Sequence, residues 1–218
     1  MKDDLIEIAS FCADKNLVPA RSGNFSARID SEKIQITQSG KDKGKLTASD
    51  LMEINYKGKA LNPEEKPSAE TLLHTQIYTL FRDVNFVAHF HSSSSAVLSK
   101  ILNKKKIKRI KLANYELLKA LSGVETHDHT EEIPIFANDQ DIFRLSMEIA
   151  PELERAIVTD KSIHAYLIAG HGLYTWGKDK AETITHVDAI NTLIESYIME
   201  IQLSKSLSKS GPKKVESK

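Results

Sequence analysis

Two short connections between predicted strands restrict the fold of this chain more than any other feature. Alternating apolar and polar residues predict strands at 24–29 and 33–37, and again at 164–169 and 173–176. Only a few residues join the strands of each pair, whereas a parallel pair needs a crossover of roughly a dozen residues or more. The sequence therefore predicts a mixed, mainly antiparallel sheet.

Segments with helical periodicity alternate with further strands along the chain. Helices are predicted at 3–16, 68–81, 93–102, 114–122, 141–150 and 181–203, and further strands at 52–56, 85–91 and 133–136. Ser68 is expected to cap the second helix, Pro151 is expected to stop the fifth, and Cys12 lies on the apolar face of the first. We therefore expect an α/β fold with helices on both faces of the sheet.

Length and composition indicate one domain and exclude several classes of protein. The 218 residues include 30 Lys+Arg and 30 Asp+Glu, without the basic excess of a nucleic-acid-binding surface, so we interpret the basic cluster at 104–111 as a solvated turn and edge strand. The single cysteine excludes an intramolecular disulfide framework and fits a reducing, cytoplasmic compartment. No apolar run could span a membrane, and the N-terminus lacks the apolar segment of a signal peptide. We expect one domain over 1–205 and a disordered Lys/Ser-rich tail over 206–218.

Histidines suggest a metal centre. His89 and His91 lie on the same face of one predicted strand, because side chains repeat with a period of two, and imidazoles so placed can share a metal ion. A third ligand is needed, and we favour His171, which lies between two glycines in a turn, over His164. The other histidines are at 74, 127, 129 and 186; the pair at 127 and 129 lies in a polar segment that we interpret as a solvated loop.

Three Ser/Gly-containing segments suggest an anion site. These are Ser22-Gly23-Asn24, Ser39-Gly40-Lys41 and Ser68, each of which offers backbone N–H groups or hydroxyls that can bind phosphate. The lysines at 41, 43 and 45 either add charge there or belong to the plain surface. Glu70 and Glu116 are both candidate acid/base residues, and the sequence physics does not choose between them.

These residues together resemble the class II aldolase/adducin superfamily over about residues 3–205. The resemblance rests on motifs that include Ser22-Gly23-Asn24-Phe25-Ser26, Thr37-Gln38-Ser39-Gly40, Pro67-Ser68-Ala69-Glu70, His89-Phe90-His91-Ser92 and Gly170-His171-Gly172-Leu173. It implies a three-layer α/β/α sandwich around a mainly antiparallel sheet, assembled as a homotetramer. It also implies that one Zn²⁺ per subunit is bound by His89, His91 and His171.

The resemblance further implies roles for the other polar residues. Gly23, Asn24, Ser39, Gly40 and Ser68 match phosphate-binding positions. Glu70 matches the acid/base of the aldolases, whereas Glu116 matches the glutamate to which dehydratases assign that role. The dehydratases of eukaryotic type can carry cysteine at the position of Glu70, and this chain keeps glutamate. On these grounds we favour Glu116 as the residue that removes a proton from the substrate.

Three stretches are typical of one branch of the superfamily, namely residues 39–44, 66–74 and 133–142. The resemblance to that branch implies a hydro-lyase of methionine salvage, which would dehydrate 5-methylthioribulose 1-phosphate to a 2,3-diketone through a metal-stabilised enediolate. A sugar-phosphate aldolase or epimerase of the fuculose- or ribulose-phosphate type, with the same zinc site, is the alternative. A non-catalytic interaction module like the adducin head fits less well, because it need not keep the histidines.

Overall fold

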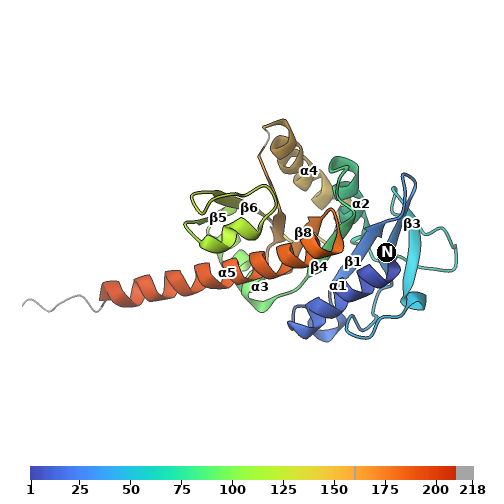
Figure 1. The fold of residues 1–218 in the computed structure, drawn as a ribbon, viewed down its shortest axis with the longest axis horizontal. Coiled ribbons are helices and arrows are strands. Elements are labelled where there is room, and N and C mark those ends of the chain that lie inside the picture. The colour runs from blue at the N-terminus through green and yellow to red at the C-terminus, as the bar shows by residue number, and fades with distance from the viewer. Residues whose placement is uncertain (160, 210–218) are drawn as a thin grey trace, which may run out of the picture.

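An eight-stranded sheet forms the centre of the computed structural model, which describes residues 1–159 and 161–209 (Figure 1). The strands are β1 (Asn24–Arg28), β2 (Lys33–Thr37), β3 (Leu51–Asn55), β4 (Phe86–Phe90), β5 (Arg109–Ala113), β6 (Thr130–Phe136), β7 (Ala165–Ile168) and β8 (Gly172–Gly177). Across the sheet they follow the order β3-β2-β1-β4-β8-β7-β6-β5. Both predicted hairpins, β1–β2 and β7–β8, pair antiparallel, and within the described residues β6 and β7 form the one parallel pair. The prediction of a mixed, mainly antiparallel sheet is confirmed.

Helices cover both faces of the sheet, so the three-layer α/β/α architecture is also confirmed. The helical elements are α1 (Lys2–Asp14), η1 (Pro19–Arg21), η2 (Ala48–Asp50), α2 (Thr71–Leu80), α3 (Ser93–Lys104), η3 (Glu116–Ala120), α4 (Ile142–Val158) and α5 (Lys180–Lys209). Helices α1, α3 and α5 pack with η3 on one face, while α2 and α4 pack against each other on the other. The long helix α5 crosses the first face and projects beyond the sheet (Figure 1).

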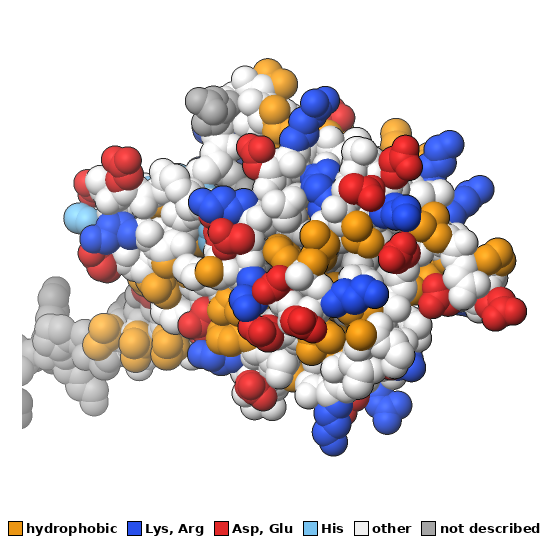
Figure 2. Space-filling model, turned by 45° about the vertical axis from the view of Figure 1, so that its right-hand side comes forward, with side chains coloured by type: hydrophobic (Ala, Val, Ile, Leu, Met, Phe, Trp, Pro, Cys, Tyr) orange, Lys and Arg blue, Asp and Glu red, His pale blue; other side chains and the backbone are white. Residues whose placement is uncertain are grey.

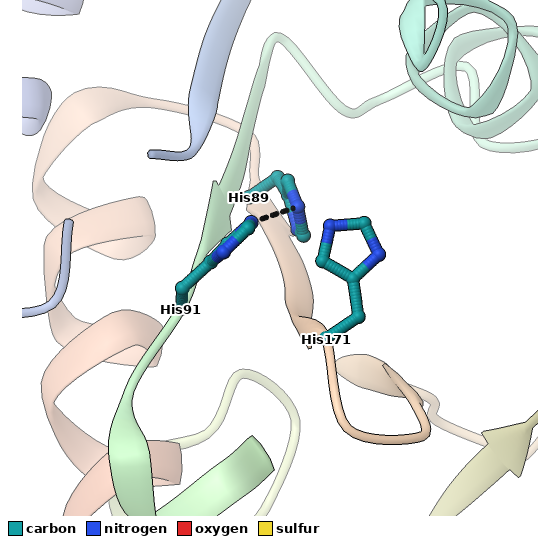
Figure 3. Close-up of side chains that lie close together, drawn as sticks. All are labelled: His89, His91 and His171. Atoms are coloured by element: carbon teal, nitrogen blue, oxygen red, sulfur yellow. Dashed lines mark hydrogen bonds between the residues drawn. The ribbon is translucent and has the colours of Figure 1, made fainter. Parts of the chain in front are cut away.

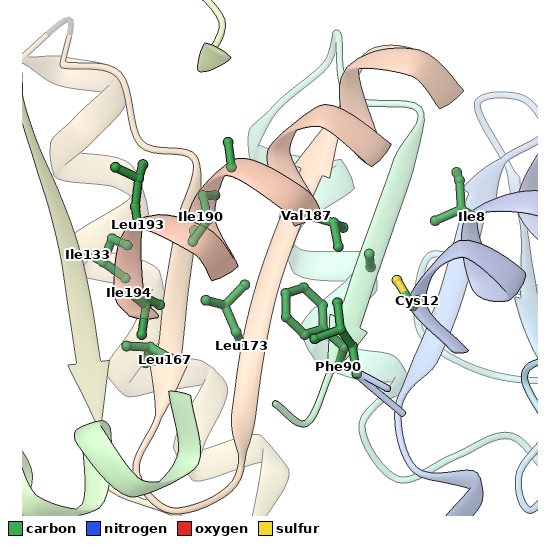
Figure 4. Packing of buried hydrophobic residues seen from close by; sticks show 14 of the residues in the cluster. Ile8, Cys12, Phe90, Ile133, Leu167, Leu173, Val187, Ile190, Leu193 and Ile194 are labelled. Atoms are coloured by element: carbon green, nitrogen blue, oxygen red, sulfur yellow. The ribbon is translucent and has the colours of Figure 1, made fainter. Parts of the chain in front are cut away.

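Each face of the sheet has its own apolar core. Under α5, Val187, Ile190 and Ile194 pack with strand residues such as Leu173, and Cys12 is buried in the same cluster, as its position on the apolar face of α1 predicts (Figure 4). The second cluster joins side chains of α2 and α4 to the opposite face of the strands. Burial of this kind contributes about 25 cal/mol per Å² of apolar surface, and it fixes the strands that carry the polar residues.

Several helix boundaries differ from the prediction. Helix α4 continues through Pro151 to Val158, because burial of residues such as Leu153 offsets the missing backbone hydrogen bond. Helix α2 begins at Thr71 rather than directly after Ser68, and the segment predicted as a helix at 114–122 contains the 3₁₀ turn η3. At the C-terminus, residues 206–209 continue α5, and the rest of the predicted tail lies outside the described residues.

The strands begin and end at two opposite borders of the sheet, which we call its edges, and strand direction decides which residues lie at each. Phe90 pairs with Leu173, Ile168 with Gly172, and β6 runs parallel to β7, so β4, β6 and β7 end at one edge. We call this the site edge. Strand β5 runs the other way, with Ala113 paired to the first residue of β6, and therefore ends at the opposite edge. A residue that follows β4 and one that follows β5 thus lie at opposite ends of the sheet.

The surface carries both signs of charge. Lys and Arg side chains are interspersed with Asp and Glu on the face shown in Figure 2, in agreement with a formal net charge of zero. None of the helices within residues 1–159 and 161–209 combines the length and the hydrophobicity that crossing a membrane requires.

A buried ion pair lies at the opposite edge, where β6 and β7 begin. The His164 Nδ1 atom is 3.1 Å from a carboxylate oxygen of Glu131, and the His164 Nε2 atom donates to the Ser122 carbonyl at 2.9 Å. Two further histidines lie nearby. Half-buried His129 contacts the same carboxylate, and the ring of buried His186 lies 5.1 Å from that of His164. Burial alone lowers the pKa of His164, but the Glu131 carboxylate and the Ser122 carbonyl outweigh it and raise that pKa. Both ring nitrogens lie close to oxygen atoms that favour the protonated form of His164.

This pair predicts a specific dependence of stability on pH. The pKa of His164 is raised by folding, so its stabilising contribution is complete below the ordinary histidine pKa of about 6.5 and is lost as the pH rises through the folded-state value. The His164→Gln variant should lose about 3 kcal/mol near pH 6 and progressively less at higher pH, as measured by urea unfolding. The matched control is exposed His127→Gln, which should show no such trend. A wild-type-to-variant difference that stays constant with pH would contradict the assignment.

Candidate metal and phosphate site

Three histidine side chains converge at the site edge. His89 is in β4, His91 follows that strand, and His171 lies in the turn between β7 and β8 (Figure 3). One ring nitrogen from each lies within 4.8 Å of the other two, and the Nε2 atoms of His89 and His91 are 2.9 Å apart. The structure therefore brings together the three residues that the sequence predicts as metal ligands. Among the described residues this is the one cluster of His, Cys, Asp or Glu side chains that could hold a metal ion.

Two glycines allow the strands and loops around the histidines to approach closely. A Cβ atom on Gly172 would lie 2.4 Å from the Phe90 carbonyl and 2.8 Å from the His89 ring. Gly23 has a φ of +76°, which favours glycine, and a Cβ there would lie 2.6 Å from the His89 carbonyl. The glycines of the Gly-His-Gly and Ser-Gly-Asn motifs thus do more than permit turns. The close packing around β4 requires a residue without a Cβ at these positions.

The orientation of His89 is fixed on both sides of its ring. Its Nδ1 atom lies 3.1 Å from the Leu173 carbonyl, to which it donates, so the Nε2 lone pair is directed toward the other histidines. The Tyr174 ring stacks on the same imidazole, with centroids 4.0 Å apart. Burial lowers the pKa of His89 well below its usual range, and burial with the nearby His171 lowers that of His91 to about 4. Both imidazoles are therefore neutral near pH 7, the form that binds metal ions.

Glu70 is the carboxylate that the structure places beside the histidines. Its Oε1 atom is 3.0 Å from the Nε2 atom of His171, and its Oε2 atom is 3.5 Å from that of His89. Burial on its own raises the pKa of this carboxyl, but the hydrogen bonds with His171 and Asn24 help to lower it far below the usual range. Glu70 is thus a carboxylate within reach of any group bound at the three histidines.

A chain of hydrogen bonds that sequence reasoning missed supports Glu70. Asn24 donates to the Glu70 carboxylate at 2.6 Å and accepts from the Nε2 atom of His74. The other His74 nitrogen accepts from Ser26 at 2.7 Å, and the Tyr78 hydroxyl lies 2.9 Å from Ser26. The sequence predicts His74 to be a packing or surface residue. Its spacing of four residues from Glu70, typical of one helix face, is the signal that could have placed it here.

The predicted phosphate-binding residues surround one small pocket next to the histidines. Its volume is about 160 Å³, and its walls include Gly23, Asn24, Ser39, Gly40 and Ser68 together with Glu70 and His91. Segments that are far apart in the sequence therefore meet at a single place. The pocket supplies backbone N–H groups and hydroxyls next to the candidate metal ligands, the arrangement expected of an anion site.

A larger cleft of about 760 Å³ adjoins this pocket, shares Glu70 with it and is also lined by His171. It is lined by the segment 64–70 and by residues 138–140, together with Gln38, Ser39 and Ile142. The three stretches that the sequence singles out as typical of one branch of the superfamily thus all contribute to this cleft. It has room for the part of a substrate that extends away from the phosphate.

The structure does not bring Glu116 to this site. Glu116 is the first residue of η3, which follows β5 and therefore lies toward the opposite edge of the sheet. Its side chain is 71% exposed and forms an ion pair with Lys119. Within one chain, Glu70 is the carboxylate placed to act beside the histidines.

Comparisons with known proteins agree with this geometry. Residues 3–198 match the family model of the class II aldolase and adducin N-terminal domain. The chain belongs to this family. It is 45% identical over 192 residues to a methylthioribulose-1-phosphate dehydratase of Methylococcus capsulatus, covering 88% of this chain and 90% of the relative. It is 42% identical over 202 residues to a protein of the same name from Sorangium cellulosum, covering 92% of each.

A solved structure of the family shows the same fold. The L-fuculose-1-phosphate aldolase of Thermus thermophilus superposes with a TM-score of 0.69 at 23% sequence identity, covering 97% of this chain and all of that one. At this identity the likeness establishes the shared fold. The fold class predicted from the sequence is thereby supported by both the architecture and a relative.

The donor set fits a divalent metal ion of borderline softness. Three imidazoles would hold such an ion and would leave it free to bind a further ligand, as catalytic sites do, and Glu70 contacts two of the three imidazoles. The Leu173 carbonyl holds His89 in the tautomer that can bind a metal. The residues present therefore fit a three-histidine metal centre.

The close packing of Gly172 predicts that Gly172→Ala abolishes metal binding. The added methyl group would displace the Phe90 carbonyl and the rings of His89 and His91. The three ring nitrogens would then no longer converge. Metal content, measured by inductively coupled plasma mass spectrometry, should fall at least about tenfold. As a matched control, Gly123→Ala, whose added Cβ meets nothing within 4 Å, should keep its metal. Full metal occupancy in Gly172→Ala would refute this account of the site.

Proposed function

We propose that this protein is a zinc-dependent hydro-lyase that converts 5-methylthioribulose 1-phosphate to 5-methylthio-2,3-diketopentyl 1-phosphate in methionine salvage. The observation that carries the proposal is the convergence of three imidazoles and Glu70 at a small pocket and an adjoining larger cleft, both of which Glu70 lines. Two relatives that bear the name of this dehydratase, at 45% and 42% identity over nearly their whole length, support it.

His89, His91 and His171 would hold one Zn²⁺ per subunit. When bound, the ion supplies a Lewis acid that polarises the C2 carbonyl of the substrate and makes the proton on C3 more acidic. The histidines contribute neutral donors whose orientation is set before the metal arrives, since His89 is held by the Leu173 carbonyl and the Tyr174 ring.

The small pocket would anchor the phosphate on C1. Gly23, Asn24, Ser39, Gly40 and Ser68 would donate backbone and side-chain hydrogen bonds to its oxygens. Anchoring one end of the substrate converts binding energy into alignment of C2 and C3 beside the histidines and Glu70. The methylthio end would then lie in the larger cleft, where Pro67, Ala69 and Ile142 offer apolar contacts.

Dehydration needs a base for the proton on C3 and an acid for the hydroxyl that leaves C4 as water. We assign removal of the C3 proton to Glu116, as the family resemblance implies, and Glu116 returns that proton to the C4 hydroxyl, which leaves as water. We assign to Glu70, an ionised carboxylate, the role of accepting a hydrogen bond from the leaving hydroxyl and orienting it. Glu70 is placed for this by Asn24, which donates to its carboxylate, and by the hydrogen bonds of His74 behind it. The enol that forms then becomes the 2,3-diketone by tautomerisation.

Glu116 can take part only if a neighbouring subunit supplies it, because within one chain it lies toward the opposite edge of the sheet. We therefore propose a homotetramer in which η3 of one subunit approaches the histidines of another. Exposed apolar side chains support an assembly: Met199 and Leu203 are 54% and 63% exposed on α5, and Val97 and Ile101 are 57% and 47% exposed on the neighbouring α3. Such side chains on adjacent helices are typical of interfaces between copies.

The aldolase or epimerase alternative uses the same site. It differs in the bond that breaks, C3–C4 instead of C4–O, and in the polar rather than apolar tail of its substrate. The fuculose-phosphate aldolase of similar fold favours it, whereas the dehydratase relatives match this chain at about twice the sequence identity. An interaction module without activity fits less well, since the three histidines and Glu70 are all in contact.

We also propose a cytoplasmic location. The single cysteine, Cys12, is a free thiol buried in the apolar core, and burial raises its pKa. A protein with this thiol and no disulfide has no need of an oxidising compartment.

The direct test is to incubate the zinc-loaded protein with 5-methylthioribulose 1-phosphate and to identify the product by NMR. We expect the diketone. Dihydroxyacetone phosphate with an aldehyde would establish the aldolase instead, and an epimeric sugar phosphate would establish the epimerase. The His89→Ala variant should lose bound metal and turnover while its circular dichroism spectrum is retained, because His89 contributes little apolar surface to the core.

Mixing two inactive variants tests whether Glu116 acts across subunits. His89→Ala removes the metal site and Glu116→Gln removes the base, so each homotetramer should be inactive. Co-refolded hybrids should regain part of the wild-type activity, because some sites then combine an intact metal centre with a partner's Glu116. Mixing His89→Ala with His91→Ala is the matched control and should give no recovery.

Two results would count against this assignment. Full activity of Glu116→Gln would remove Glu116 from the mechanism, and inactive hybrids of a confirmed tetramer would restrict the chemistry to groups of one chain. Analytical ultracentrifugation measures the assembly independently of activity, with a tetramer expected at four times 24.4 kDa.

A further inference from the structure

Lys43 is a buried lysine directly behind the small pocket. Its side chain is 2% exposed, and its ammonium donates to the Arg21 carbonyl at 3.1 Å and to the Lys41 carbonyl at 2.8 Å. Arg21 and Gly40, next to Lys41 in the chain, both line the pocket. Lys43 thus joins two loops that both line the candidate phosphate site.

The charge of Lys43 has no close counterion in the part of the chain that the structure describes. Its partners are backbone carbonyls, and the neighbouring Asp42 uses its carboxylate to accept from the Gly44 backbone. Burial lowers the pKa of this ammonium, and the charge of the neighbouring Asp42 opposes that shift only in part. A buried cation without an ion pair is costly to the fold, so an anion bound close to it would be favoured.

The neighbouring lysines differ from Lys43 in this respect. Lys41 is 42% exposed and pairs with Asp50 at 2.8 Å, and Lys45 is exposed to solvent. Of the three lysines that the sequence suggests as sources of charge, only Lys43 is therefore buried. Exposed lysines are screened by water and salt, whereas a buried ammonium keeps its effect on an anion a short distance away.

The pocket in front of Lys43 is suited to an anion and lacks a cationic side chain of its own apart from Arg21. The Ser22 hydroxyl, one of its lining groups, is buried and has no hydrogen-bond partner within the described residues. His91 lines the same pocket and is influenced by the charge of Lys43. The pocket wall also includes one carboxylate, Glu70, whose oxygens are already bonded to Asn24 and His171. The unpartnered Ser22 hydroxyl and the positive charge next to the wall are complementary to a phosphate dianion.

We propose that Lys43 is a positioning residue that gives this pocket its affinity for a phosphate dianion, by holding its two walling loops together and by supplying a buried positive charge behind them. The proposal rests on the phosphate pocket of the proposed function and deepens it. A phosphorylated substrate would neutralise the ammonium on binding, so the pocket would select phosphate esters over the corresponding free sugars.

Replacing Lys43 by methionine tests this, because methionine fills a similar volume without the charge. Inorganic phosphate is the probe, and its binding to the zinc-loaded protein is measured by isothermal titration calorimetry and by the shift in Tm that it causes. Lys43→Met should bind phosphate at least about tenfold more weakly than wild type. With the substrate, KM should rise by a similar factor while kcat changes by less than about threefold.

Two further variants keep the test informative. Lys45→Met, which removes an exposed charge from the same loop, should bind phosphate like the wild type. Lys43→Gln keeps N–H donors but has no charge, and it is used if Lys43→Met does not fold. It should show the same loss of phosphate affinity. Metal content and circular dichroism establish that each variant is intact.

The outcomes separate this proposal from the proposed function. Wild-type phosphate affinity in folded, metal-loaded Lys43→Met or Lys43→Gln would overturn the role of Lys43, even if the protein dehydrates its substrate. Weaker phosphate binding in these variants, with Lys45→Met unaffected, would support it even if the catalysed reaction proved to be aldol cleavage. A merely structural role would lower thermal stability without this selective loss of phosphate binding.

Discussion

The antiparallel pairing of β4 with β8 is the interaction on which the site depends. It brings the turn that holds His171 against the strand end that holds His89 and His91, and the absence of a Cβ on Gly172 lets the backbones come close enough. The same pairing provides the Leu173 carbonyl that fixes the His89 ring. The apolar clusters on the two faces of the sheet hold this geometry before any ligand is bound.

Two charged or polar groups lie next to the three imidazoles, the Glu70 carboxylate and the small pocket with its nearby lysine. Glu70 is held by Asn24 and, behind it, by neutral His74, so a charged carboxylate is stabilised beside His89 and His171. The small pocket, which Glu70 also lines, has donors at its surface and the Lys43 ammonium close to its walls. A carboxylate and an anion pocket next to three imidazoles suit chemistry on a carbon next to the carbonyl of a sugar phosphate.

The two edges of the sheet divide the functional residues. The histidines, Glu70 and the pocket lie at the site edge, whereas Glu116 lies toward the opposite edge, where the buried Glu131–His164 pair also lies. His164 and His186 both bond to Ser122, just beyond η3, and so tie the Glu116-bearing segment to the sheet. A chain with this arrangement needs a second copy if both glutamates are to act on one substrate.

The sequence by itself determined the mixed, mainly antiparallel sheet, because short connections permit little else, and it determined the histidine pair, because residues two apart in a strand share a face. It also pointed to His171 and to the Ser/Gly segments through their local chemistry. Only the tertiary structure decided that Glu70 and not Glu116 lies beside the histidines of its own chain, that His74 supports it, and that Lys43 is the buried lysine. The physical reason is that local patterns fix which face of an element a side chain occupies, whereas the packing of distant segments fixes which side chains meet and which charges lose their contact with water.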